Sequence, residues 1–202
     1  MAIRTGNWKQ NLIIDGKAFQ VTVGTFSTPI QGGGAGTIFD LDQPELAISV
    51  PTGTAIMPLR IRVDCQTPLI AADNDECEIL IAIDRTVAVA DGTSTSETAF
   101  NMRTDLTGTN KASLCTVRSA FTGNITVAPT LGLELSHRVI VGDVQGTPAN
   151  ALWGSLMEEY EPDQAPVIVG PATLLVYWGG TVATSGFCSA SWAEFATAEV
   201  TT

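Results

Sequence analysis

The sequence is poor in positive charge and almost devoid of histidine. Lys and Arg together number 10 against 21 acidic residues, which gives a net charge of −11, and the chain has 1 histidine. A duplex-binding protein needs clustered Lys and Arg for phosphate contacts, and most zinc hydrolases need several His ligands. The composition therefore argues against both classes, and we expect no direct binding to nucleic acid.

Long apolar runs are missing as well. No stretch approaches the roughly 20 apolar residues that a membrane-spanning helix needs. Residues 1–10 lack the apolar segment of a secretory signal. We therefore expect a protein that is made in a cytoplasm and does not insert into a membrane.

Cysteine is scarce and its spacing carries no motif. The 4 cysteines are Cys65, Cys77, Cys115 and Cys188, and no two of them stand in the C-x-x-C spacing of a zinc or redox site. Cytoplasmic synthesis favours free, buried thiols, and a bridge between Cys65 and Cys77 is the alternative that the sequence leaves open.

Motifs that carry catalytic or ligand chemistry are also absent. The glycines of residues 31–36 are not followed by the helix and Lys-Ser/Thr pair of a phosphate-binding loop. His137 lacks a G-x-S-x-G elbow, and we interpret it as a strand histidine hydrogen-bonded at the rim of the fold. The acidic runs at 73–76 and 158–163 fit neither an EF-hand nor a spaced carboxylate pair. We predict no enzyme activity and no catalytic, cofactor-binding or metal-binding residues.

Strand patterns, in contrast, are abundant. The two clearest lie within residues 54–89, where apolar and polar side chains alternate along each strand. The apolar faces consist of Met57, Leu59, Ile61, Val63 and Cys65 in the first strand and Cys77, Ile79, Ile81 and Ile83 in the second. A polar turn that begins near Pro68 separates the strands. We therefore predict an antiparallel hairpin that brings Cys65 and Cys77 together on its buried face.

Similar signals continue along the chain. An Asp-Gly pair at 15–16 predicts the turn of a hairpin over residues 12–23. Residues 149–166 are the least strand-like, because apolar residues from Leu152 to Tyr160 recur at helical spacing. A short helix and an extended segment are both open there.

These patterns together define a fold class. They give about eight to ten strands separated by turn signals, which suits two packed antiparallel sheets. We predict an all-β fold in which residues 11–202 form a single two-sheet antiparallel sandwich. Residues 1–10 are expected to form an irregular N-terminal arm.

The 4 tryptophans pose the main functional alternative. Exposed on a concave surface, they would stack on sugar rings; buried, they would anchor the core or a subunit interface. Trp192 shares a strand face with Cys188 and Ala190, which favours burial. The candidate subunit-interface or anchor residues are Trp8, Trp153, Tyr160 and Trp178.

The order of these features resembles that of single jelly-roll virion proteins of viruses and bacteriophages. The resemblance rests on the irregular arm, the many strands and long polar loops, and the phrase VPTGTAIMPLRIRV at 50–63. It also rests on the closing strands PATLLVYWGG at 171–180 and SGFCSASWAEF at 185–195. It implies a jelly-roll sandwich and a structural protein that self-assembles into a particle or decorates one.

The partners implied are copies of the chain itself, as a trimer or pentamer, and other virion proteins. The expected location is the virion, after synthesis in the host cytoplasm, and no cofactor is expected. A mean hydropathy of +0.22 with 15% charged residues also favours subunit contacts. The alternative is a carbohydrate-binding or adhesin-like β-sandwich module of a phage tail or cell surface, with a glycan as its ligand.

Overall fold

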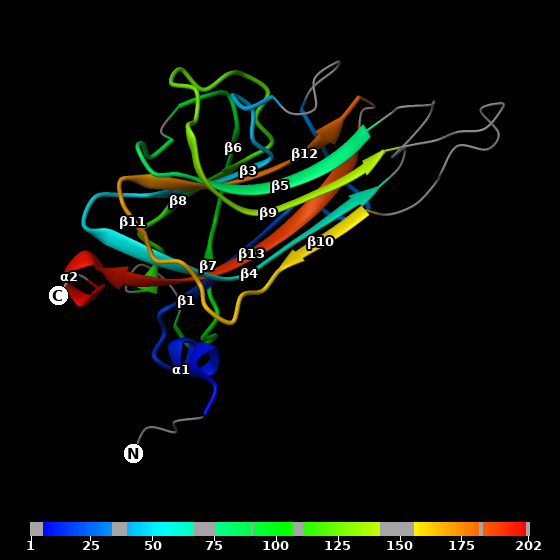
Figure 1. Ribbon diagram of the computed structural model, residues 1–202. Coiled ribbons are helices and arrows are strands. Elements are labelled where there is room, and N and C mark those ends of the chain that lie inside the picture. The colour runs from blue at the N-terminus through cyan, green and yellow to red at the C-terminus, as the bar shows by residue number, and fades with distance from the viewer. Residues whose placement is uncertain are drawn as a thin grey trace.

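Two antiparallel sheets pack face to face (Figure 1). The computed structural model describes residues 6–33, 40–66, 76–89, 91–106, 111–141, 156–181 and 184–200. Sheet A contains β1 (Ala18–Val23), β2 (Ile30–Gln31), β4 (Thr54–Gln66), β7 (Phe100–Asn101), β10 (Leu156–Tyr160), β11 (Ile168–Val169) and β13 (Ser185–Ala196). Sheet B contains β3 (Leu46–Val50), β5 (Glu76–Asp84), β6 (Thr95–Glu97), β8 (Thr116–Ser119), β9 (Leu131–Val141) and β12 (Ala172–Gly180). The predicted all-β sandwich is confirmed.

Strand pairing is nested along the chain. β1 pairs with β13, β3 with β12, β4 with β10, and β5 with β9, in every case antiparallel. The strand order is β10-β4-β13-β1-β7 in sheet A and β6-β8-β3-β12-β5-β9 in sheet B. Strands far apart in the sequence are therefore neighbours, and the innermost pair is β5 with β9.

The hairpin predicted between residues 54–66 and 76–84 is wrong. These residues form β4 and β5 as expected, but β4 pairs with β13 and β10 whereas β5 pairs with β12 and β9. A period of two shows which face of a strand is buried, and it carries no information about the neighbouring strand. The turn expected between the two strands lies outside the described residues.

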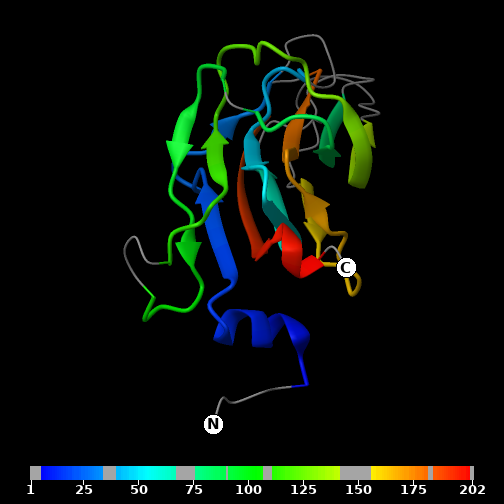
Figure 2. The same cartoon turned by 90° about the vertical axis from the view of Figure 1, so that its left-hand side faces the viewer.

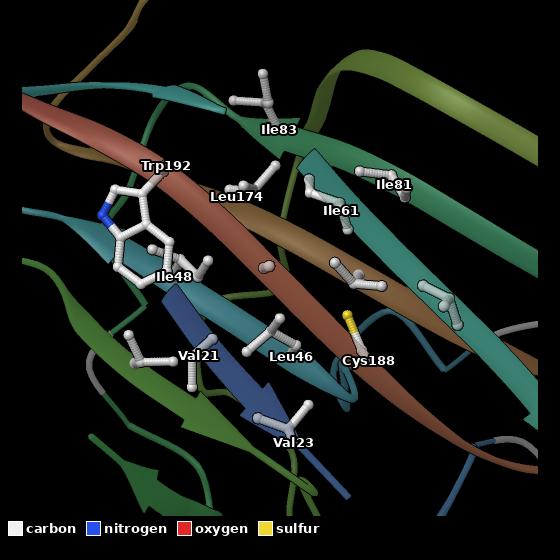
Figure 3. Close-up of a cluster of buried hydrophobic side chains, with 14 of the residues drawn as sticks. Val21, Val23, Leu46, Ile48, Ile61, Ile81, Ile83, Leu174, Cys188 and Trp192 are labelled. Carbon is white, nitrogen blue, oxygen red and sulfur yellow. The ribbon is translucent and has the colours of Figure 1, made fainter. Parts of the chain in front are cut away.

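The core lies between the sheets. Both sheets contribute to a cluster of aliphatic side chains, the two tryptophans Trp178 and Trp192, and four cysteines. Figure 3 shows part of this cluster, with Trp192 and Cys188 among its residues. Cys188 and Trp192 point inward from β13, as the sequence predicted, and each has 0% exposure. Each fully buried Ile or Leu side chain stabilises the fold by roughly 1.5–3 kcal/mol relative to an exposed one. The sandwich therefore owes its stability mainly to this apolar layer.

A β-bulge changes the face of Leu59. Pro58 pairs with Trp192 and Arg60 with Ser191, so that Leu59 has no partner on β13. The extra residue shifts the alternation of β4, and Leu59 packs on the outer face of sheet A with Ala18. Leu59 was predicted on the same face as Ile61, and that prediction is wrong because strict alternation does not survive a bulge.

The N-terminal region contains a helix where the sequence predicted an arm and a strand. Asn7 caps α1 (Trp8–Ile14), since its Oδ1 accepts hydrogen bonds from the backbone N–H of Lys9 at 2.9 Å and of Gln10 at 3.3 Å. Trp8, Leu12 and Ile13 pack against the outer cluster that contains Leu59. The predicted hairpin over residues 12–23 is therefore wrong, and Gly16, with a φ of 70°, turns the chain from the helix into β1.

The remaining elements close the fold. Residues 156–160 form β10, so the helical alternative is wrong for this part of 149–166; Leu152 lies outside the described residues. Leu80 and Ala82 of β5, which the sequence placed on a mostly polar face, are buried under Phe121 and Ile125. Val89, Phe121 and Ile125, from segments that follow β5 and β8, cover this outer face of sheet B. A short helix, α2 (Thr197–Val200), follows β13 (Figure 2).

Candidate subunit-contact surface

The predicted anchor residues have different locations. Trp178 is fully buried, and its Nε1 donates to the backbone oxygen of Ile30 at 3.2 Å. It anchors the core and has no exposed surface to offer another subunit. Trp8, the first residue of α1, is partly buried against the outer cluster that contains Leu59. Tyr160 is half-buried at the end of β10, where burial raises its pKa. Trp153 lies outside the described residues.

His137 and several acidic side chains of the sequence make close polar contacts. His137 lies on the edge strand β9, with its Nε2 2.8 Å from Glu78 Oε2 and its Nδ1 3.8 Å from Glu134 Oε1. Glu159 pairs with Arg60 at 2.7 Å. Within the described ranges, no group of three or more His, Cys, Asp or Glu side chains could hold a metal ion.

Exposed apolar side chains gather on one flank of the sandwich. There, β9 forms an edge of sheet B, β10 forms an edge of sheet A, and β11 lies beside β4 (Figure 1). Most of the large apolar side chains that are exposed in the described chain lie here: Leu131, Leu133, Val139 and Val141 on β9, Met157 on β10, and Val167 and Val169 at β11. We call this surface the β9 flank.

The β9 flank has a free strand edge. Among the described strands β9 has one neighbour, β5, and it runs for 11 residues with most of its side chains exposed. A hollow of about 340 Å³ lies beside the start of β9, lined by Leu133, Val167 and Val169 among others. A long apolar edge with unpaired backbone groups is a site where another chain can pair.

Polar contacts tie the two sheet edges together on this flank. The Ser136 hydroxyl donates to a Glu158 oxygen, and Arg138 Nη1 lies 3.6 Å from Glu158 Oε2. Ser136 and Arg138 come from β9 whereas Glu158 comes from β10. These contacts hold the edge in place, and the charged groups on β9 limit which chains can approach it.

A second hollow lies on the opposite flank. It has a volume of about 590 Å³ and is bounded by β6 and β7, the strands that end the two sheets on that side, and by β1, which pairs with β7. Gln20, Thr22 and Asn101 supply polar groups to it, and the ring of Phe100 is 70% exposed beside them. This β6–β7 groove has the size of a small-ligand site.

Sequence reasoning missed the buried carboxyl group of Glu45, which is 3% exposed. Its two oxygens accept hydrogen bonds from the backbone N–H of Gly33 at 2.6 Å and of Trp178 at 2.9 Å. Burial raises the pKa of Glu45 to about 8, against the opposing effect of these two donors. The residue follows Pro44 in what reads as a turn, and its one signal is its position directly before the apolar strand 46–50.

Comparisons of the chain with family models, with curated proteins and with solved structures find no match. In the part of the chain that the structure describes, no helix has the length and apolar character needed to cross a membrane. The geometry of the sandwich and its surfaces is therefore the basis for assigning a function.

Proposed function

We propose that the sandwich is a jelly roll and that the protein is a structural virion protein, which self-assembles into a viral or phage particle or decorates one. The strand order supports the jelly roll. Eight strands form four nested pairs: β1 with β13, β3 with β12, β4 with β10, and β5 with β9. From the outermost pair to the innermost, the pairs alternate between sheet A and sheet B, so each sheet contains four of these strands. A long hairpin rolled up in this way gives the two Greek keys of a jelly roll, a fold found in capsid proteins and lectins.

The β9 flank is the observation that carries the proposed role. Exposed apolar side chains concentrate on β9, the edge strand of sheet B, and burial against another subunit would remove them from water. Copies of the chain are the partners proposed for this surface, as a trimer or pentamer, with other virion proteins beyond them. The net charge of −11 suits an outer, minor or decorating position, away from the genome.

The test is the mass of the protein in solution, measured by size-exclusion chromatography with light scattering at micromolar concentration. We expect an oligomer, and we expect Val139→Lys to weaken self-association about 10- to 100-fold because it places an unpaired charge in the apolar contact. Leu114→Lys is the matched control, since Leu114 is 65% exposed and stands just before β8, which β3, β12 and β5 separate from β9 in sheet B. A stable monomer, or equal loss of association in both variants, would contradict the proposal.

Carbohydrate binding is the second candidate function. The β6–β7 groove favours it, because Phe100 exposes a ring next to amide and hydroxyl groups of Gln20, Thr22 and Asn101. Sugars bind proteins through stacking on aromatic rings combined with hydrogen bonds to such groups. Glycan-array binding by the isolated protein would favour this role, and an empty array together with self-association would leave the structural role alone.

A further inference from the structure

Two buried cysteines from different sheets contact each other in the core. Cys65 lies on β4 of sheet A and Cys77 on β5 of sheet B, and both have 0% exposure within the same apolar cluster. Their thiols are free, and they are joined by a side-chain hydrogen bond. The contact therefore bridges the two layers of the sandwich.

Each cysteine has a glycine beside it on one neighbouring strand. Cys65 pairs with Gly186 of β13 on one side and with Leu156 of β10 on the other, and Cys77 pairs with Gly180 of β12 and with Ile140 of β9. On one side, each cysteine therefore has the smallest neighbour that a strand can offer.

Hydrogen bonding distinguishes Cys77 from the other cysteines. It accepts a hydrogen bond from Cys65 and a second from Thr184 Oγ1 at 3.6 Å, and the contact with Cys65 lowers its pKa. The same contact raises the pKa of Cys65, which keeps its proton. Burial raises the pKa values of Cys115 and Cys188. Cys77 is therefore the thiol that most readily becomes the nucleophilic thiolate.

We propose that Cys65 and Cys77 form a disulfide between the sheets when a hydroperoxide, a small oxidant that can enter a buried site, reaches them. The Cys77 thiolate attacks one peroxide oxygen, the O–O bond breaks, and Cys77 becomes a sulfenic acid while hydroxide leaves. The sulfur of Cys65 then attacks the sulfur of Cys77, and its proton with the departing hydroxide gives water. The hydroxide released in the first step takes up the proton that the Cys77 thiol lost. With hydrogen peroxide as the oxidant, two thiols are therefore oxidised, one peroxide is reduced, and two waters form.

The disulfide would be a covalent cross-link between the two sheets whose formation depends on the redox environment. In a reducing cytoplasm both thiols stay free, and under oxidising conditions β4 and β5 become linked. Because the cross-link restricts the unfolded chain, the oxidised protein should melt about 5 to 10 °C higher than the reduced protein.

The experiment treats the full-length protein with hydrogen peroxide, denatures it, alkylates the remaining thiols with N-ethylmaleimide and maps the peptides by mass spectrometry. We expect the 4 free thiols to fall to two and a peptide pair joined through Cys65 and Cys77. Recovery of all four thiols, a different cysteine pair, or over-oxidised Cys77 without a bridge would overturn the proposal.

Two variants with one buried cysteine removed provide matched controls. Cys188→Ala should still lose two thiols and gain the same melting shift, whereas Cys77→Ala should lose none and show no shift. Equal behaviour of the two variants would contradict a specific bridge. If Cys77→Ala fails to fold, the peptide map of the unaltered chain decides the question alone.

Discussion

The buried carboxyl group of Glu45 makes the stability of the protein depend on pH in a direction that can be worked out. The pKa of this group is 4.5 in the absence of perturbation and about 8 in the folded chain. As pH rises between these values, the unfolded chain releases the Glu45 proton while the folded chain keeps it. The unfolded state then binds fewer protons, so the free energy of unfolding falls with pH.

The size of this effect follows from the pKa difference of about 3.5. At about 1.36 kcal/mol for each pKa unit, the full loss is about 5 kcal/mol at pH 8 and above. Glu45→Gln removes the titration, but its amide nitrogen cannot accept the hydrogen bond from Gly33 or Trp178. One unpaired buried N–H costs about 1–3 kcal/mol at every pH. The variant should therefore be less stable than the parent near pH 5 and more stable near pH 8.

Urea unfolding between about pH 5 and 8, followed by the fluorescence of the buried Trp178 and Trp192, measures this difference. Glu134→Gln is the matched control, because its side chain is 58% exposed and its stability curve should follow that of the parent protein. Curves for Glu45→Gln and the parent that run parallel over this range, without crossing, would refute the reasoning.

Two further predictions concern the backbone. A Cβ on Gly180 would lie 1.7 Å from the Glu76 backbone oxygen, so Gly180→Ala should strongly lower the midpoint of urea unfolding. Gly132→Ala is the control and should change the midpoint little, because a Cβ there meets only the flexible Arg85 side chain, at 3.2 Å. Asn7→Ala should cost about 1 kcal/mol of unfolding free energy by removing the cap of α1, and unchanged urea curves would contradict a role for that cap.

The sequence predicts the strands of this fold better than it predicts their partners. Residues 172–180 and 185–196 alternate or run apolar as buried strands do, and both form the centre of a sheet. The partner of β4 on one side is β13, more than 100 residues further along the chain, and no local pattern specifies that pairing. A hairpin with the nearest strand is the simplest local prediction, and here the tertiary arrangement overrides it.

Cys65 and Cys77 illustrate the difference between predicting a strand and predicting its partner. Their contact was predicted from a symmetric hairpin, in which the two residues would be backbone neighbours. In the structure Cys65 lies between Gly186 and Leu156, Cys77 lies between Gly180 and Ile140, and the two thiols meet because the sheets face each other. The alternation of each strand toward the core was sufficient to bring them together, although the pairing assumed was wrong.

The β9 flank could not be recognised from the sequence, because exposure depends on where a strand lies in its sheet. Leu133, Val139 and Val141 are large apolar residues, and in the structure each is exposed on the edge strand β9. The one local signal is the charged run of Glu134, His137 and Arg138 inside an apolar strand, which is typical of edges.

The nested pairing explains why this particular edge stays open. β9 and β10 follow one another along the chain, yet each is the last strand of its own sheet, so the chain changes sheets at this flank. The later strands β12 and β13 are held in the interior of their sheets by two neighbours each, and no described strand remains to pair with β9. In the assembly proposed above, a second copy of the chain would take the place beside β9 that no described strand occupies, and it would cover the apolar side chains there.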